Sequence, residues 1–249
     1  MSMLKSPAGL KPDYGIDAPG IVRLFLLGGG TGVVLAAILW RLAESLPMFW
    51  VIIAKMVFWP GLTFLLTGLA MLYGSKVGKL RLRDQLITKL QLRGDEQVLD
   101  VGCGRGLMLL GIAGKLTTGR AVGIDLWQAQ DQSGNAITTT EENARREGVA
   151  ERVELHTGDM RELPFNDNHF DVIVSSWAIH NIPAAAGRQK AMQQIARVLK
   201  PQGRLVIVDI SYVSEYRAEL QRLGWTDITR LGPSFQFVLP SYQLWARKP

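Results

Sequence analysis

The sequence has little histidine and almost no cysteine, and these two scarcities exclude several kinds of site. Of its 249 residues, three are histidine and one is cysteine, Cys103. A single cysteine cannot form an intrachain disulfide, which suits a reducing compartment. Neither the histidines nor the cysteine have the spacing of metal ligands, so we expect no metal site. No Ser-His-Asp arrangement has support in the sequence either.

The chain also lacks the features of a secreted or nucleic-acid-binding protein. Residues 2–20 are polar and contain three prolines, so they do not have the form of a signal peptide. The net charge is +6 and the pI about 9.6, but few aromatic residues lie beside basic ones, which argues against nucleic acid. The basic residues cluster instead at residues 76–93, directly after an apolar region. There they favour an anionic membrane surface, or form a solvated stretch that only sets topology.

Apolar residues crowd into the first third of the chain, where two long segments lie at residues 21–42 and 48–73. Each has about the ~20 residues that a helix needs to cross a bilayer. The short link between them predicts an antiparallel hairpin, and Pro60-Gly61 could kink the second helix. A hairpin buried in a soluble protein, or inserted into one face of the bilayer, is the alternative. The length and the near-absence of charge of both segments favour a two-span membrane hairpin. The basic cluster after the second segment predicts that both termini face the cytoplasm.

These boundaries predict a cytosolic tail at residues 1–20, a transmembrane hairpin at 21–74 and a globular domain at 75–249. From about residue 80 the pattern changes to alternating strands and helices. Strands are expected at residues 97–101, 121–125, 153–156, 170–175, 204–210, 227–231 and 241–246. Helices are expected at residues 107–116, 138–147, 188–199 and 215–223. The alternation predicts an α/β fold whose parallel sheet carries helices on both faces.

A glycine-rich turn follows the first of these strands. Residues 98–106 read VLDVGCGRG, and glycines there let the backbone turn sharply and approach a ligand closely. Ligands of such folds bind at the carboxyl ends of the strands. Asp125 ends the second strand, at the position of a carboxylate that accepts hydrogen bonds from ribose hydroxyls. A nicotinamide dinucleotide is the rival ligand, but its fingerprint Gly-x-Gly-x-x-Gly requires glycine where Leu107 stands.

On these residues the sequence resembles the class I S-adenosylmethionine-dependent methyltransferases, nearest in pattern to the ubiquinone/menaquinone and sterol methyltransferases. The resemblance covers residues 86–249 and implies a Rossmann-like sheet with S-adenosylmethionine as the cofactor. It implies that the glycine turn cradles the methionine portion, that Asp125 holds the ribose and that Asp159 binds the adenine amino group. The cofactor-binding residues that it implies are Asp100, Gly102, Cys103, Gly104, Gly106, Asp125, Leu126, Trp127, Asp159, Met160, Ser175, Ser176 and Trp177. It departs from the family at the turn 199–203, where Gln202 replaces one of two usual glycines.

The acceptor side is less defined. Methyl transfer from a sulfonium needs mainly alignment, and a base only if the acceptor must lose a proton. His180, which follows the fourth strand, is the best candidate base, although a histidine that only hydrogen-bonds its own loop is the alternative. The polar residues 128–140 either line the acceptor pocket, with Asp131 as a second candidate base, or form a solvated loop. Tyr14 and Asp17 of the tail could fold over the site as a lid.

Together these features predict a membrane-anchored methyltransferase that acts on a small-molecule or lipid-like acceptor. The lipid-like acceptor follows from the anchor, because a hydrophobic acceptor partitions into the bilayer where a tethered enzyme meets it. Two other functions stay open. One is a non-catalytic S-adenosylmethionine-binding membrane adaptor or sensor, and the other is a different S-adenosylmethionine reaction on the same fold, such as aminopropyl transfer.

Overall fold

The computed structural model describes residues 11–42, 47–128, 134–237 and 239–249. Its internal contacts divide the chain into two compact units. The hairpin unit comprises residues 16–79 with the described residues 236–237, and the α/β unit comprises residues 11–15, 80–235 and 239–249. The short segment 11–15 therefore belongs to the α/β unit although it precedes the hairpin in the sequence.

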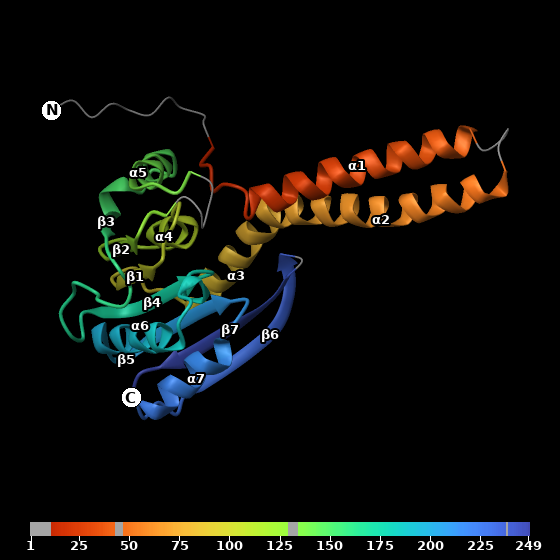
Figure 1. Ribbon diagram of the computed structural model, residues 1–249. Coiled ribbons are helices and arrows are strands. Elements are labelled where there is room, and N and C mark those ends of the chain that lie inside the picture. The colour runs from red at the N-terminus through yellow and green to blue at the C-terminus, as the bar shows by residue number, and fades with distance from the viewer. Residues whose placement is uncertain (1–10, 43–46, 129–133, 238) are drawn as a thin grey trace. The chain divides into compact units, whose positions relative to one another are not determined.

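Two long helices, α1 (Pro19–Leu42) and α2 (Met48–Tyr73), form the hairpin unit (Figure 1). Their backbones approach each other through glycine: a Cβ on Gly29 would lie 2.3 Å from the backbone nitrogen of Leu65. α2 continues across Pro60 as one helix. By length and apolar composition, both helices could cross a membrane. In their most apolar stretches, only 17% and 11% of the residues are buried.

A π-helical turn, η2 (Gly74–Gly78), follows α2 and leads into α3 (Lys79–Leu90). Near the start of the hairpin unit, Asp17 accepts hydrogen bonds from the ammonium group of Lys79 and donates its backbone N–H to the hydroxyl of Ser75. Asp17 is therefore part of the hairpin unit in this structure and pairs with the residues that follow α2.

A seven-stranded sheet with the order β3-β2-β1-β4-β5-β7-β6 forms the centre of the α/β unit. Its strands are β1 (Gln97–Val101), β2 (Arg120–Asp125), β3 (Val153–Thr157), β4 (Phe170–Ser176), β5 (Leu199–Asp209), β6 (Ile228–Phe237) and β7 (Leu239–Arg247). β1 to β5 pair in parallel, and β7 pairs antiparallel with β5. The carboxyl ends of the five parallel strands thus share one edge of the sheet, where the site is built.

Helices cover both faces of this sheet, as the alternation of elements predicts (Figure 1). α3, α4 (Leu107–Ala113) and α5 (Ile137–Arg146) lie on one face, and α6 (Ala185–Val198) and α7 (Val213–Arg222) lie on the other. Two short 3₁₀ turns, η3 (Ala150–Arg152) and η4 (Ile179–Asn181), complete the unit. The expected Rossmann-like fold is confirmed.

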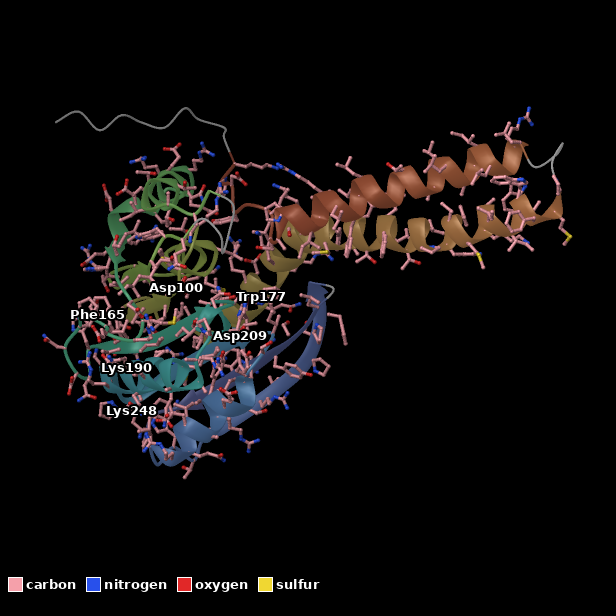
Figure 2. All side chains as sticks on the ribbon, viewed as in Figure 1. Asp100, Phe165, Trp177, Lys190, Asp209 and Lys248 are labelled. Atoms are coloured by element: carbon pink, nitrogen blue, oxygen red, sulfur yellow. The ribbon has the colours of Figure 1, made fainter. Side chains whose placement is uncertain are left out.

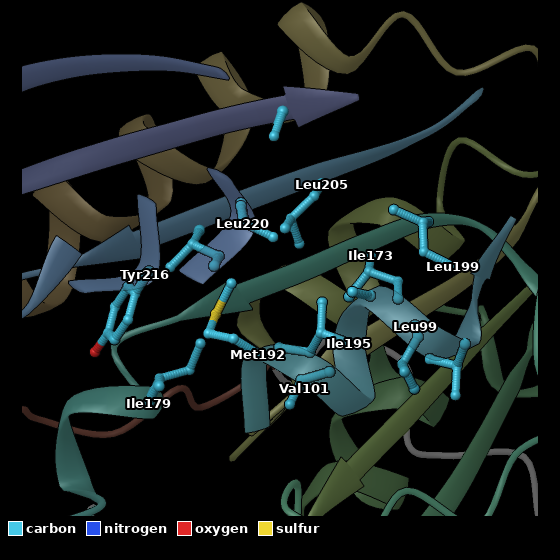
Figure 3. Close-up of a cluster of buried hydrophobic side chains, with 14 of the residues drawn as sticks. Leu99, Val101, Ile173, Ile179, Met192, Ile195, Leu199, Leu205, Tyr216 and Leu220 are labelled. Carbon is cyan, nitrogen blue, oxygen red and sulfur yellow. The ribbon is translucent and has the colours of Figure 1, made fainter. Parts of the chain in front are cut away.

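The core lies between the sheet and the helices α6 and α7 (Figure 3). α6 presents Met192 and Ile195 to the strands, and both side chains are fully buried, as their helical spacing predicts. Tyr216 of α7 is 1% exposed in the same cluster, and Ile179 joins it from η4. Because Ile179 precedes His180, this packing fixes the loop that carries the predicted base.

The structure corrects the sequence prediction at several element ends. The sheet is mixed rather than wholly parallel, since β7 runs antiparallel to β5. The closing strands are longer than expected, since β6 continues through Gly232-Pro233 to Phe237 and β7 runs from Leu239 to Arg247. β5 begins at Leu199, so the turn expected at residues 199–203 is part of the strand. α4 ends at Ala113, where Gly114 follows, rather than at residue 116.

Candidate functional site

The glycine turn between β1 and α4 has a backbone that other residues rarely adopt. Gly102, Gly104 and Gly106 have φ angles of +74°, +48° and +85°, in the left-handed region that favours glycine. A Cβ on Gly102 would also lie 2.2 Å from the Cβ of Ala178. The turn is therefore bare backbone beside the loop that follows β4, and such a surface lets a ligand approach closely.

Asp125 lies beside this turn, as the sequence predicts. One carboxylate oxygen accepts a hydrogen bond from the backbone N–H of Gly104 at 2.8 Å. The other accepts from the backbone N–H of Trp127 at 2.7 Å and from the side-chain amide of Asn135 at 3.3 Å. These bonds hold the carboxylate at the carboxyl ends of β1 and β2, the position of a ribose-binding acid.

Asp100 lies deeper than the turn and is only 2% exposed. Its carboxylate accepts a hydrogen bond from the backbone N–H of Leu109, in the first turn of α4, at 2.9 Å. Burial raises the pKa of this carboxyl to about 7, and the negative charge of Asp125 adds to the shift. The family resemblance implies that Asp100 binds the cofactor, and its buried position directly before the glycine turn leaves that role a prediction.

Cys103 is buried inside the turn, where burial raises the pKa of its thiol well above the ordinary value. A thiol in such surroundings is unreactive, because the thiolate is the nucleophilic form. Cys103 therefore fills space in the turn, in contact distance of Gly123 on β2.

The predicted adenine side is formed by the residues that follow β2 and β3. Trp127 has a left-handed backbone, with φ +57°, and its indole N–H donates to the hydroxyl of Thr157 at 2.8 Å. Leu126 is 46% exposed. Asp159 makes a bidentate ion pair with Arg161, which lowers the pKa of the Asp159 carboxyl. Arg161 thus keeps the Asp159 carboxylate ionised and holds its orientation.

The loop after β4 carries the remaining predicted residues. The hydroxyl of Ser175 is buried and donates to the carbonyl of Val101 at 2.8 Å, so it joins β4 to β1. Ser176 and Trp177 follow at the end of the strand, and Trp177 has φ +56°. Met160 approaches the turn from the β3 side, 3.5 Å from the position of a Cβ on Gly102. Asp100, Trp177 and Asp209 lie in this same region of the unit (Figure 2).

His180 is held by a residue that the sequence analysis missed. Its ring Nδ1 lies 2.5 Å from a carboxylate oxygen of Asp209, and its backbone N–H donates to the other oxygen. Asp209 is fully buried at the end of β5, and the hydroxyl of Tyr216 also donates to it, at 3.1 Å. The His180 side chain remains 20% exposed. Asp209 could have been noticed, because it ends a buried strand at the same sheet edge as Asp125.

The other residues predicted near the acceptor, in the polar segment 128–140 and the tail, do not gather around His180 in the described part of the chain. Asp131 lies outside the described residues. Asn135 binds the ribose-side carboxylate of Asp125, and its side-chain oxygen is buried without a hydrogen-bond partner among the described residues. Tyr14 is 6% exposed and donates its hydroxyl to Glu147 at the end of α5.

S-adenosylmethionine fits this arrangement of residues. Gly102 and Gly106 keep the turn close to its neighbours in a left-handed backbone, since a Cβ on Gly106 would lie 2.9 Å from the side chain of Thr140. The adjacent carboxylate of Asp125 has the chemistry that ribose hydroxyls need, and Asn135 brings a buried unpartnered oxygen to the same place within the described part of the chain. The fold and the turn together define a Rossmann-like domain of the methyltransferase class.

The family is then shown by comparison with known proteins. Residues 92–226 match the family described as Methyltransferase domain, and the chain belongs to this family. S-adenosylmethionine is the family's cofactor, as the sequence predicts. The identity of the family and the predicted fold class are both confirmed.

Similar proteins differ in what they do. Methyltransferase GfsG of Streptomyces halstedii is 36% identical over 52% of this chain and 43% of its own. Demethylmenaquinone methyltransferase of Lactobacillus johnsonii is 26% identical over 63% of this chain and 60% of its own. The chain thus spans about half the length of the curated relatives it matches. The crystal structure of the [4+2]-cyclase SpnF has a similar fold, with a TM-score of 0.57, 22% identity and coverage of 68% and 80% of the two chains.

Proposed function

We propose that the chain is a membrane-anchored methyltransferase that transfers the methyl group of S-adenosylmethionine to a small, lipid-like acceptor. The left-handed glycine turn beside Asp125, at the carboxyl edge of the sheet, is the observation that carries this proposal. The cofactor supplies a methyl group already activated on a sulfonium. Gly102 to Gly106 and Asp125 would hold its methionine and ribose parts, so the protein's main task is to align the acceptor.

The hydrogen bond between His180 and Asp209 supports catalysis over binding alone. A carboxylate that accepts the Nδ1 proton leaves Nε2 with a lone pair, which suits a general base. Asp209 is buried among four donors: the ring and backbone of His180, the hydroxyl of Tyr216 and the backbone N–H of Ile210. In this proposal His180 removes a proton from the acceptor's hydroxyl or carbon, and Asp209 positions the ring.

The hairpin supports the membrane part of the proposal. Its helices are long and apolar, and side chains such as Leu27, Met56 and Trp59 are more than 60% exposed, which suits contact with lipid. Lys76 and the basic residues after it follow the second helix, so both termini and the α/β unit would lie in the cytoplasm. A relative named for demethylmenaquinone is consistent with an acceptor dissolved in the bilayer.

Transfer of a radiolabelled methyl group tests the proposal. The full chain, in detergent, is incubated with labelled donor and either membranes or a water-soluble metabolite extract from the same cells. We expect label in an extractable lipid only when membranes are present. Asp125→Asn should abolish donor binding and transfer, whereas His180→Asn should retain donor binding and lose transfer by about 10²-fold or more.

The other results separate the remaining functions. Label found only in water-soluble products would contradict the lipid-like acceptor and leave the methyltransferase in place. Donor binding without transfer to either extract would contradict catalysis and support the adaptor function. Equal transfer by His180→Asn and the wild type would show that His180 is a structural histidine.

A further inference from the structure

A short segment ahead of the hairpin is bound to the outer side of the glycine turn. We call residues 11–15 the strap. The backbone N–H of Asp13 donates to the side-chain oxygen of Asn143 on α5, and the amide of Asn143 donates back to the carbonyl of Asp13, both at 2.9 Å. Asn143 is 1% exposed. The strap and α5 are therefore joined by a reciprocal pair of hydrogen bonds that excludes water.

The same asparagine also holds the glycine turn. Its amide donates to the carbonyl of Arg105 at 3.0 Å, and Thr140, one helical turn earlier, donates its hydroxyl to the carbonyl of Gly104 at 2.7 Å. On the inner side, the N–H of Gly104 donates to Asp125. The peptide groups of the turn are thus hydrogen-bonded on both sides, to the carboxylate of Asp125 on the inner side and to side chains of α5 on the outer side.

The strap adds a charge to this outer contact. Arg105, which lies between the two left-handed glycines 104 and 106, donates to a carboxylate oxygen of Asp13 at 2.9 Å. The Arg105 side chain is only 11% exposed, whereas that of Asp13 is 53% exposed. The other oxygen of Asp13 accepts the N–H of Gly15, which holds the carboxylate in place.

Tyr14 attaches the strap to the α/β unit. Its ring is buried, its hydroxyl donates to Glu147 at 2.7 Å, and the guanidinium of Arg83 lies 6.0 Å from its centre. Burial and the neighbouring carboxylate raise the pKa of Tyr14, so it stays a hydrogen-bond donor at any physiological pH. A buried aromatic side chain of this kind makes the strap an ordered part of the unit rather than a loose tail.

We propose that the strap is a positioning element of the donor site, in which Asp13 acts through Arg105 to hold the glycine turn in its cofactor-binding conformation. Cofactor affinity then depends on a segment that lies outside the glycine turn and ends four residues before the first residue of α1. This role differs from a lid over the acceptor, because the contacts that the strap makes outside itself, as described above, are with α3, α5, Glu147 at the end of α5, and Arg105. The inference rests on the proposed function only in taking the turn as the donor site.

Asp13→Asn in the full chain is the test. The substitution keeps an oxygen that can accept the N–H of Gly15. It places an amide N–H opposite the guanidinium of Arg105, so two hydrogen-bond donors then face each other. Asp167→Asn is the matched control, because Asp167 is a similarly exposed aspartate, 68%, paired with Arg197 far from the turn in sequence and fold. Two quantities are measured. One is hydrogen exchange of the backbone at residues 102–106 in the absence of cofactor, and the other is the dissociation constant of the demethylated cofactor by calorimetry.

We expect Asp13→Asn to speed exchange at the turn and to weaken cofactor binding about fivefold, equivalent to about 1 kcal/mol. Asp167→Asn should change neither quantity. In a double-mutant cycle, Asp13→Asn should have no further effect once Arg105 is replaced by glutamine.

Unchanged exchange and affinity in Asp13→Asn would overturn the proposal, as would equal effects of the two asparagine variants. A loss of thermal stability alone, with both turn measurements unchanged, would reduce the strap to a structural role and overturn it too. Failure of the wild type to bind the cofactor would refute the proposed function, whereas exchange at the turn, measured without ligand, would still decide the role of the strap.

Discussion

At the residue scale, the burial of Asp100 makes the stability of the folded protein depend on pH. A carboxyl with a raised pKa keeps its proton in the folded state at a pH where the unfolded chain has released it. Its ionisation therefore opposes folding as pH rises from about 4 to about 7, the value to which burial raises this pKa. Above that range the ionised group costs the folded state on the order of 4 kcal/mol.

We expect Asp100→Asn to stabilise the cofactor-free protein at pH 8 by several degrees and to have a smaller effect at pH 5. The asparagine oxygen can still accept the N–H of Leu109, so the local structure is kept. Thermal unfolding of both proteins at the two pH values measures this difference. An equal shift at pH 5 and pH 8 would show that the charge of Asp100 is not the cause.

Several site residues could be predicted from sequence because their roles are local. The glycine turn is contiguous, and Asp125 ends a recognisable strand, so the pattern alone places both at one sheet edge. Asp209 was missed because its importance comes from a contact with His180, 29 residues away. The sequence suggested Tyr14 as part of a lid but not the partners of the strap, because nothing near Asp13 indicates Asn143, which lies 130 residues later.

At the scale of elements, the hairpin depends on which glycines face the partner helix. Gly29 of α1 meets the backbone of α2, whereas a Cβ on its neighbour Gly28 would have nothing within 4 Å. The two positions have the same intrinsic helix preference, so they separate packing from propensity.

We expect Gly29→Ala to push α1 away from α2 and to destabilise the full chain in detergent by about 1–3 kcal/mol. Gly28→Ala should be neutral or slightly stabilising, because alanine favours helix. Loss of folded protein on heating, followed by size-exclusion chromatography, measures both variants. Equal behaviour of the two would mean that the helices do not pack through Gly29 in solution.

The elements themselves were largely predictable, because alternating apolar patterns and glycine stops are local signals. β1 matches its predicted range, and most other parallel strands agree within a residue or two. The pattern fails where pairing rather than sequence sets the length. β6 and β7 extend each other beyond their apolar centres, and β5 gains five residues at its start, where β4 and the chain end lie beside it.

At the scale of the whole molecule, the proposed topology can be mapped with cysteines. Native Cys103 is buried, so it should not react with maleimide in the folded protein. We expect Met48→Cys, at the exposed start of α2, to be labelled by an impermeant maleimide on intact cells. Glu151→Cys, on the exposed surface of the α/β unit, should be labelled only after the membrane is opened. Labelling of Glu151→Cys on intact cells would contradict a cytoplasmic α/β unit.

In the proposed membrane topology, the strap requires the hairpin to return to the side of the bilayer from which it starts. Residues 11–15 are hydrogen-bonded to the same unit that resumes at residue 80, so the intervening segment is an excursion that leaves and returns to one body. Such a segment must make an even number of crossings, because if α1 crosses a bilayer, α2 must cross it in the opposite direction. Basic residues added at the far end of the hairpin therefore could not move only one of its two ends to the opposite side of the bilayer, unless Tyr14 lost its buried position in the α/β unit.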